Sequence, residues 1–241
     1  MGDRPLLFLE RHCKPLQASP RLLAVAIDAP HLALVVLVAH APHAADDEKV
    51  REEFWEEVEH IHDRWGVDIM LCDANAHVGS DTSAAIGGEG FREQQDLSGS
   101  MFHSTLHHME HVAVNTHMST GPVHYTFIKK RPKKDPNQDE VEEDLFGPEL
   151  EIDKYIRHRK DYVTVSRKLW NAVRDSWVIS DLDSLHGASD HMPVTATFDA
   201  ICEKSAKSNC SFLLPKQVAN EDTEIFQSHC VHSLPTVGDG Y

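Results

Sequence analysis

The side chains of this sequence that are best suited to catalysis lie in three short polar clusters. Asp73 and Asn75 form the first cluster, Asp161 belongs to the second, and Asp190 with His191 forms the third. Carboxylates activate water, while amide and imidazole groups stabilise the charge that builds up on an attacked phosphorus. The side chains therefore predict hydrolysis of a phosphodiester.

Each of these residues suits a separate role. Asp73 directly follows a buried apolar run, which makes it the best candidate for the base, and Asn75 is placed to hydrogen-bond the phosphate or the attacking water. Asp190 and His191 are adjacent, so their side chains diverge and one faces a metal while the other faces the phosphate. Asp161 is suited to orient His191 and to favour its charged form.

Short apolar runs bounded by turn residues must position these clusters. The pattern predicts strands over 22–27, 31–39, 67–72, 112–117, 124–128, 162–166 and 192–198. It also predicts a helix that is capped by Asp46 and ends at Gly66, a second helix over 100–110 and a helical turn over 169–173. Helices interleaved with short strands, joined by hairpins and crossovers, are typical of a layered α/β (α+β) domain.

Composition sets the boundaries of this domain. With 241 residues and 41% hydrophobic residues, the chain is long enough to bury one substantial core. We expect a poorly ordered lead over 1–20, a domain over 21–199 with a charged insertion at about 129–160, and a weakly ordered tail over 200–241.

The charge balance restricts the partners. A formal net charge of −16 argues against general binding of nucleic acid, because non-specific contacts to phosphate come from Lys and Arg. One basic run exists, and a solvated loop is its favoured interpretation; it comprises Lys129, Lys130, Arg131, Lys133 and Lys134. The five cysteines form no C-x-x-C pair, and neither a signal segment nor a membrane-length apolar run is present. We therefore expect an intracellular protein, cytoplasmic or nuclear, that does not enter membranes.

Two other features admit a functional reading. His103, His107 and His111 recur at helical spacing and suit zinc or copper, but a solvated helix face is favoured because no H-E-x-x-H motif or cysteine ligand accompanies them. Trp55 and Trp65 are suited to stack on bases, but their spacing on the first helix favours core positions.

The clusters resemble motifs of the endonuclease/exonuclease/phosphatase superfamily, which includes abasic-site endonucleases and the endonuclease domains of non-long-terminal-repeat retrotransposons. L-C-D-A-N-A at 71–76 resembles its G-D-F-N-A motif, D-Y-V-T-V-S at 161–166 its I-D-Y-x-x-x-S strand, and S-D-H-M-P-V at 189–194 its S-D-H-x-P-[IV] ending. His40 lies in an H-A-P segment similar to one on the phosphate side of the family's site, and Y-T-F at 125–127 resembles the segment before the D-Y strand.

The resemblance implies a DNase I-like fold, a two-sheet β-sandwich flanked by helices, with Mg²⁺ or Mn²⁺ as cofactor and DNA as the substrate. Hard oxygen ligands and a substrate phosphate suit Mg²⁺ on physical grounds as well. The implied roles are activation of water by Asp73, a transition-state contact by Asn75, a phosphate contact by His40, a partner of His191 in Asp161, and a metal-side carboxylate in Asp190.

One departure divides the functional hypotheses. The family carries a metal-binding glutamate far upstream of the G-D-F-N-A motif, and the stretch before Asp73 is too short to hold it. We therefore expect the chain to correspond to the C-terminal two-thirds of such a domain, without its N-terminal strands and with apolar sheet surface exposed. It is either a metal-dependent endonuclease or an inactive remnant that at most binds nucleic acid or protein.

Overall fold

A computed structural model describes residues 10–29, 32–90, 92–130, 155–180 and 190–199. All of these residues belong to one compact unit, Met1–Cys202. The expected tail over 200–241 lies outside the described residues, as does most of the expected charged insertion, residues 131–154.

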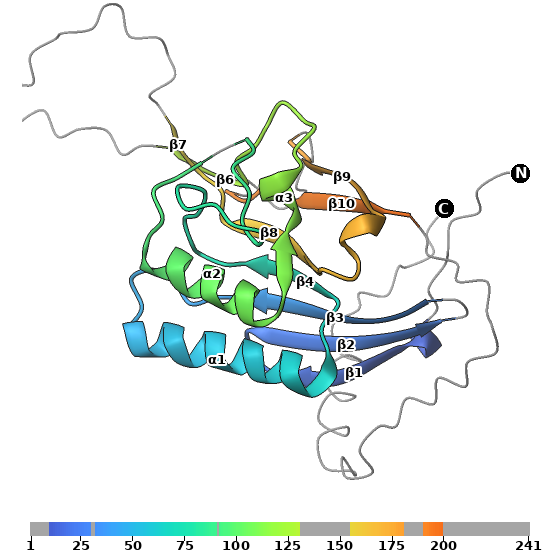
Figure 1. The fold of residues 1–241 in the computed structure, drawn as a ribbon. Helices are drawn as coiled ribbons and strands as arrows, with labels where there is room; N and C mark the ends of the chain where they lie inside the picture. Colours follow the sequence, from blue (N-terminus) through green and yellow to red (C-terminus); the bar gives the residue numbers. More distant parts are fainter. Residues whose placement is uncertain (1–9, 30–31, 91, 131–154, 181–189, 200–241) are drawn as a thin grey trace, which may run out of the picture. The chain divides into compact units, whose positions relative to one another are not determined.

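A six-stranded mixed sheet forms the centre of the unit (Figure 1). In spatial order its strands are β1 (Cys13–Ala18), β2 (Leu22–Ala29), β3 (Leu32–His40), β4 (Ile69–Asp73), β8 (Asp161–Ser166) and β5 (His111–Ala113). Only β3 and β4 pair in parallel, and α1 (Glu48–Trp65) connects them. Two small antiparallel sheets complete the strands: β9 (Val173–Val178) with β10 (Val194–Phe198), and β6 (Phe127–Lys130) with β7 (Tyr155–His158).

Capping residues set the ends of the two long helices. Asp47, one residue after the expected cap, accepts a hydrogen bond from Lys49 N and starts α1, and Gly66 ends it in the left-handed conformation, with φ 65°. Asp96 accepts a hydrogen bond from Gly99 N at 2.6 Å and starts α2 (Leu97–His108) three residues before the expected boundary. The remaining helical segments are short: η1 (Glu10–His12), α3 (Val114–His117) and η3 (Trp170–Ala172).

One face of the central sheet packs against α1 and α2 to form the main core. Trp55 on α1 packs against Phe102 on α2, with ring centroids 5.4 Å apart, and the ring of Phe102 is 4.9 Å from that of Tyr162 on β8. Trp55 is buried, as the core interpretation of this residue predicts. The packing of α1 and α2 on this face holds the strands in place, so the side chains on the opposite face keep fixed positions.

The opposite face of the sheet is apolar and only partly covered. Cross-strand pairing places eight aliphatic side chains on it: Leu23, Val25, Ile27, Leu34, Val36, Val38, Ile69 and Leu71. Near β8 this face packs against β9 and β10. On β3 and β4, Val38 and Leu71 remain 45% and 42% exposed. The sequence predicts this exposed apolar sheet surface.

The structure also differs from the sequence-based expectation in its strands. Residues 13–18, expected to precede the ordered domain, form the edge strand β1 on β2. Residues 112–117, expected as one strand, divide into the end of β5 and α3. The described residues contain one large sheet and two small ones, instead of the two extended sheets of a sandwich. No helix among them combines the length and apolar character that a membrane span requires.

Candidate active site

Three polar side chains form a row across neighbouring strands at one end of the central sheet. His40 ends β3 and is paired with Asp73 at the end of β4, and Asp73 is in turn paired with Asp161 at the start of β8. Paired residues point to the same face, so all three side chains lie on the face opposite the helices. They lie on the same face as Val38 and Leu71 and form the polar end of that apolar face.

Asp161 binds the imidazole of His191. His191 Nδ1 lies 3.0 Å from one carboxylate oxygen of Asp161 and 3.2 Å from the other. This hydrogen bond, strengthened by the nearby acids, raises the pKa of His191 above its ordinary value although burial opposes the charged form. The structure therefore favours an imidazolium at this position.

Backbone hydrogen bonds fix both partners of this pair. The buried hydroxyl oxygen of Thr126 accepts hydrogen bonds from Lys160 N and Asp161 N, at 2.9 and 3.0 Å. Thr126 O accepts a hydrogen bond from Met192 N at 2.7 Å, and Ile128 N donates to Asp190 O at 2.8 Å. The segment around Thr126 thus holds the start of β8 and the S-D-H segment together, although they lie far apart in the sequence.

Asp73 lies beside both the imidazole of His40 and the carboxylate of Asp161. Its Oδ2 is 3.6 Å from His40 Nε2, and its Oδ1 accepts a hydrogen bond from Asn75 N at 3.1 Å. Burial and the negative charge of Asp161 raise the pKa of Asp73, against the hydrogen bond from Asn75, which lowers it. A carboxylate with a raised pKa is a stronger base and accepts a proton from water more readily.

Asn75 is held in a strained backbone conformation. Its φ is 44°, in the left-handed region where asparagine is tolerated better than most residues. Its side-chain amide donates a hydrogen bond to Ala41 O at 3.0 Å, which ties the loop after β4 to the end of β3. An amide nitrogen has two hydrogens, so this bond uses one of its two donors.

The row opens onto a cleft with a volume of about 490 Å³. Its lining includes His40, Asp73, Asn75, Asp190 and His191, so five of the six residues predicted from the sequence face one space, and the sixth, Asp161, contacts it through His191. The other lining residues are Arg21, Ala41, His43, Asp46, Phe127, Lys129 and Lys160.

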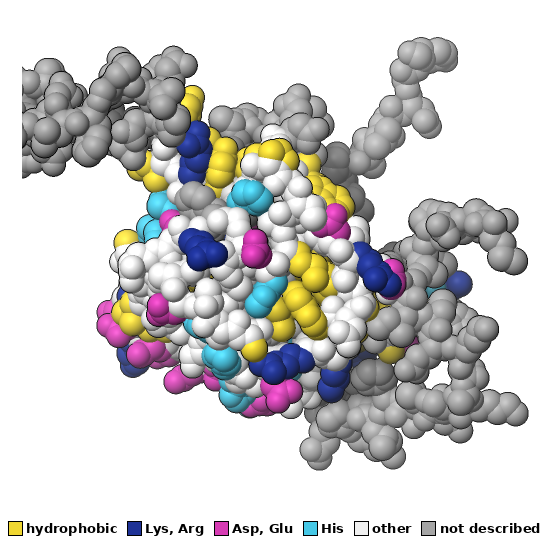
Figure 2. Space-filling view, turned by 45° about the horizontal axis from the view of Figure 1, so that its top comes forward, with side chains coloured by type: hydrophobic (Ala, Val, Ile, Leu, Met, Phe, Trp, Pro, Cys, Tyr) yellow, Lys and Arg dark blue, Asp and Glu magenta, His cyan; other side chains and the backbone are white. Residues whose placement is uncertain are grey.

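Three cationic side chains in this lining are not among the residues predicted for the site: Arg21, Lys129 and Lys160. Lys160 lies over the ring of Phe127, with Nζ 4.3 Å from the centroid. Figure 2 shows basic side chains scattered singly over the visible face, so a phosphate-binding surface has to come from such local groups. Sequence adjacency identifies only Lys160, which directly precedes Asp161.

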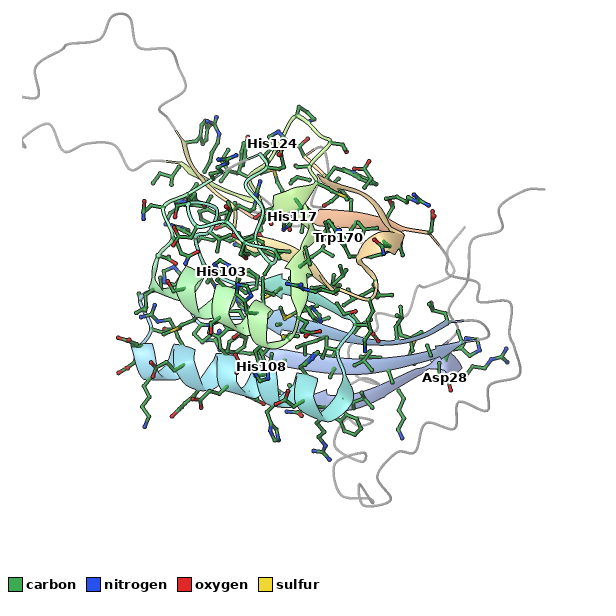
Figure 3. The ribbon with its side chains drawn as sticks, in the orientation of Figure 1. Asp28, His103, His108, His117, His124 and Trp170 are labelled. Carbon is green, nitrogen blue, oxygen red and sulfur yellow. The ribbon has the colours of Figure 1, made fainter. Side chains whose placement is uncertain are left out.

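The expected alignment of three histidines on one helix is wrong for His111. The helix α2 ends at His108, and His111 is buried on β5. His103 lies on α2 (Figure 3) and stacks on His107, with ring centroids 5.0 Å apart. His103 Nε2 also lies 2.7 Å from Ser83 Oγ. These contacts support a structural role for His103 instead of metal binding.

A divalent cation fits the acids of the cleft. Ligand atoms of Asp73, Asp161 and His191 all lie within 4.8 Å of one another. Asp190, the acid expected on the metal side, lines the same cleft but is not part of that group. The carboxylate oxygens of this group, rather than the imidazole hydrogen-bonded to Asp161, are the ligands that Mg²⁺ prefers.

Comparison with known proteins relates this fold to solved structures. The sequence matches no protein-family model and no curated protein. The structure is similar to the endonuclease domain of TRAS1, a telomere-specific non-LTR retrotransposon, with a TM-score of 0.53 and 16% sequence identity over 80% of this chain and 71% of that one. It is also similar to the 3′ phosphatase NExo from Neisseria bound to a product DNA hairpin, with a TM-score of 0.50 and 19% identity over 78% of this chain and 72% of that one.

Both similarities cover about four fifths of the chain at low sequence identity, so what they show is the fold. The sequence motifs predict the same fold. The protein therefore has a fold similar to that of the TRAS1 endonuclease domain and of NExo.

Proposed function

We propose that this protein is a divalent-metal-dependent phosphodiester hydrolase that acts on DNA as an endonuclease. The observation that carries the proposal is the row of His40, Asp73 and Asp161, with His191 bound to its last member, beside a cleft with three cationic side chains. The fold supports the proposal, because the similar TRAS1 structure is an endonuclease domain and the similar NExo structure is bound to a product DNA hairpin.

In this mechanism Asp73 accepts a proton from a water molecule, whose oxygen attacks the phosphorus. The bond from phosphorus to one ester oxygen breaks, and that oxygen takes a proton from solvent water. A phosphomonoester remains on one strand end and a hydroxyl on the other. Asp73 is suited to this step because its raised pKa brings its basicity closer to neutral pH. His40 Nε2 lies 3.6 Å from Asp73 Oδ2, and the imidazole contacts the phosphate from β3, the strand next to β4.

His191 stabilises the charge of the pentacovalent phosphorus. The carboxylate of Asp161 keeps its imidazole protonated and oriented. Lys129 and Lys160 line the same cleft and attract the phosphate backbone. Asn75 offers its remaining amide hydrogen to a phosphate oxygen.

Asp161 and Asp190 are the carboxylates that would hold Mg²⁺ or Mn²⁺ beside the base, and the bound ion would neutralise charge on the scissile phosphate. These two acids supply few ligands for an ion that prefers six. Water and substrate phosphate are expected to supply the others.

Nicking of supercoiled plasmid and of a duplex with an abasic site, with Mg²⁺ or Mn²⁺, tests the proposal. Asp73→Asn keeps the size of the side chain and an oxygen for Asn75 N, but removes the base, so cleavage should fall by about 10²- to 10⁴-fold. Asp28→Asn is the matched control. Arg21, which lines the cleft, directly precedes β2, whereas Asp28 lies near the opposite end of that strand (Figure 3). Equal activity of both variants, or no cleavage by the wild type with either ion, refutes the proposal.

One observation favours a second candidate function. The exposed side chains of Val38 and Leu71 leave apolar sheet surface beside the row, as expected of a truncated remnant that at most binds nucleic acid or protein. Fluorescence anisotropy with labelled duplex DNA separates the two. Binding by the wild type without cleavage, unchanged in Asp73→Asn, supports the second candidate and excludes the first.

A further inference from the structure

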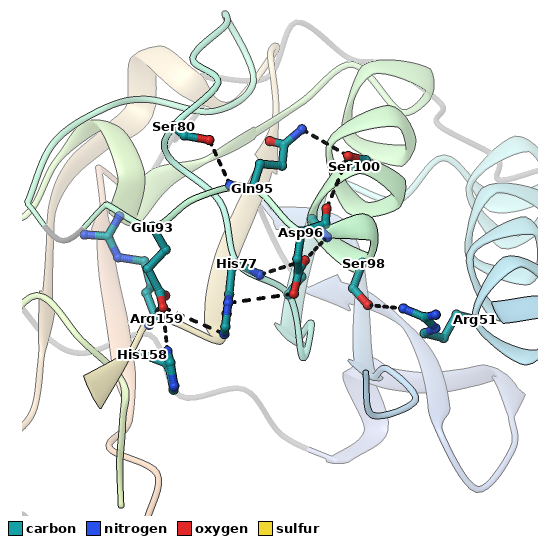
Figure 4. Close-up of polar contacts among 12 residues, drawn as sticks. Arg51, His77, Ser80, Glu93, Gln95, Asp96, Ser98, Ser100, His158 and Arg159 are labelled. Carbon is teal, nitrogen blue, oxygen red and sulfur yellow. Dashed lines mark hydrogen bonds and ion pairs between the residues drawn. The ribbon is translucent and has the colours of Figure 1, made fainter. Parts of the chain in front are cut away.

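A second group of metal-ligand side chains lies outside the row that carries the proposed hydrolysis. It consists of His77, Glu93 and His158, whose ligand atoms all lie within 4.8 Å of one another (Figure 4). Glu93 Oε1 is 2.5 Å from His158 Nδ1 and 3.7 Å from His77 Nε2. The two imidazole rings stack, with centroids 4.5 Å apart and an angle of 17° between their planes.

Three segments that are distant in the sequence deliver these side chains. His77 lies in the loop after β4, Glu93 in the segment before α2, and His158 at the end of β7. The first two segments are joined by a β-bridge between Gly79 and Glu93 and by a hydrogen bond from Glu93 N to Val78 O at 3.2 Å. The positions of the ligands are therefore set by the backbone rather than by chance contact of long side chains.

Glycine at position 79 permits this approach. Gly79 has a φ of 114°, and a Cβ there would lie 3.2 Å from Arg92 Cα. A side chain at this position is disfavoured both by conformation and by space. The glycine thus lets the segment that carries Glu93 come close to the loop that carries His77.

We propose that His77, Glu93 and His158 bind one zinc-type divalent cation. Two imidazole nitrogens and one carboxylate oxygen match the borderline ligand preference of zinc, and three protein ligands leave a fourth position for water. Neighbouring ligands of a tetrahedral zinc lie about 3.3–3.5 Å apart, from bond lengths of about 2.0–2.2 Å. The separations of 2.5 and 3.7 Å lie on either side of that range. Because the two rings stack at 17°, binding of one ion requires their planes to turn toward each other.

A carboxylate behind the site supports the proposed ligand atom of His77. Asp96 Oδ2 lies 3.8 Å from His77 Nδ1, on the side of the ring opposite the ligand atom Nε2. Its other oxygen accepts hydrogen bonds from His77 N at 3.2 Å and from Gly99 N at 2.6 Å, which fixes the carboxylate in place. At 3.8 Å this is an ion-pair contact, and its closure to a hydrogen bond on ion binding would raise the basicity of the imidazole as a ligand.

The local charge also favours a cation. Glu93 and Asp96 contribute two negative charges, and the buried guanidinium of Arg159 contributes one positive charge. Arg159 turns its guanidinium toward the carbonyl oxygens of His124 and Glu89, at 3.0 Å each, and only its backbone N donates to Glu93, at Oε2. Among these contacts, those of Glu93 Oε1 are therefore to the two imidazoles, and the contact to Arg159 is made by Oε2.

The proposal is independent of the proposed hydrolysis, because the two groups differ in donor type. Mg²⁺ prefers the oxygens beside Asp73, whereas zinc and cobalt prefer the imidazoles of His77 and His158. Titration of the full-length protein with Co²⁺ in excess Mg²⁺ tests it. We expect the visible absorption of four-coordinate cobalt, saturation at one equivalent, and its displacement by Zn²⁺.

Variants identify the ligands. His158→Gln and Glu93→Gln should abolish the absorption, and circular dichroism shows whether each variant is folded. Asp96→Asn keeps a helix-capping side chain but removes the charge, so it should weaken cobalt binding by about 10- to 100-fold. His60→Gln, at an exposed position on α1, and Asp73→Asn should keep the wild-type spectrum.

Absence of the cobalt spectrum in the wild-type protein overturns the proposal, and so does an unchanged spectrum in folded His158→Gln. Loss of the spectrum in Asp73→Asn would assign the ion to the other group of ligands, and also overturns it.

Discussion

Acidification should destabilise this protein through the buried imidazole of His111. Burial lowers the pKa of His111 from 6.5 to about 4, and the ring makes two hydrogen bonds at 2.9 Å. Val67 O only accepts, so Nε2 carries the hydrogen and Nδ1 accepts from the hydroxyl of Thr164. The neutral ring is therefore fully satisfied, and a second proton would have to displace the Thr164 hydrogen.

The sign of the effect follows from the order in which the two states take up a proton. Above the unfolded pKa of 6.5 both states are neutral. As the pH falls through that value the unfolded chain binds a proton and the folded chain does not, until the pH approaches about 4. Between pH 7 and pH 5 this difference removes about 2 kcal/mol from the free energy of unfolding, and below pH 4 about 3 kcal/mol in total.

Urea denaturation followed by circular dichroism at several pH values measures this contribution. His111→Gln lacks the titrating ring, so the stability advantage of the wild type over this variant should shrink by about 2 kcal/mol from pH 7 to pH 5. The subtraction cancels the other titrating groups. His60→Gln controls for the loss of one histidine at an exposed site. A difference between wild type and His111→Gln that does not change with pH refutes the reasoning.

Three further outcomes follow from the structure. Asp161→Asn removes the main cause of the raised pKa of His191. The fall in kcat/KM for nicking at alkaline pH, where the imidazole loses its charge, should therefore move to lower pH. A pH profile that does not move would contradict this role of Asp161. Asn75→Ala should cost about 1 kcal/mol more than Asn75→Gly in urea denaturation, because φ is 44°, and equal costs would argue against strain. Leu71→Thr, on the exposed face of the sheet, should change the free energy of unfolding by less than about 0.5 kcal/mol. Met70→Ala, on the buried face, should lower it by about 2–5 kcal/mol. Similar costs for the two variants would show that the face with Leu71 is covered in solution.

Local sequence signals predict the elements whose determinants are close together. The apolar spacing of α1 and the glycine that ends it are such signals, and the structure confirms both, with Gly66 in the left-handed conformation. The three polar clusters predict a common site because each ends or precedes a strand, and cross-strand pairing brings Asp73 and Asp161 side by side.

The features that the sequence does not reveal depend on distant partners or on single hydrogen bonds. The strand β1 lacks an alternating pattern and contains Pro15, which is tolerated because β1 lies at the sheet edge. The turn from β5 into α3 accompanies a hydrogen bond from Thr116 Oγ1 to Ala113 O at 2.7 Å, which no apolar pattern encodes. Glu93 lies in a loop without periodicity, and only the fold brings it to His158.

The pairing of β3, β4 and β8 makes the proposed site sensitive to strand slippage. A shift of β4 by one residue would turn Asp73 toward the helices and place Cys72 or Ala74 in the row, because side chains alternate between faces. A shift by two residues would restore the face but carry the carboxylate about 7 Å along the strand. Single-residue insertions or deletions within β4 should therefore eliminate hydrolysis even where the chain still folds. The loop between α1 and β4 cannot absorb such a change, because Val67 is buried and Asp68 accepts a hydrogen bond from Val35 N. The fold therefore requires constant length from Gly66 to Asp73.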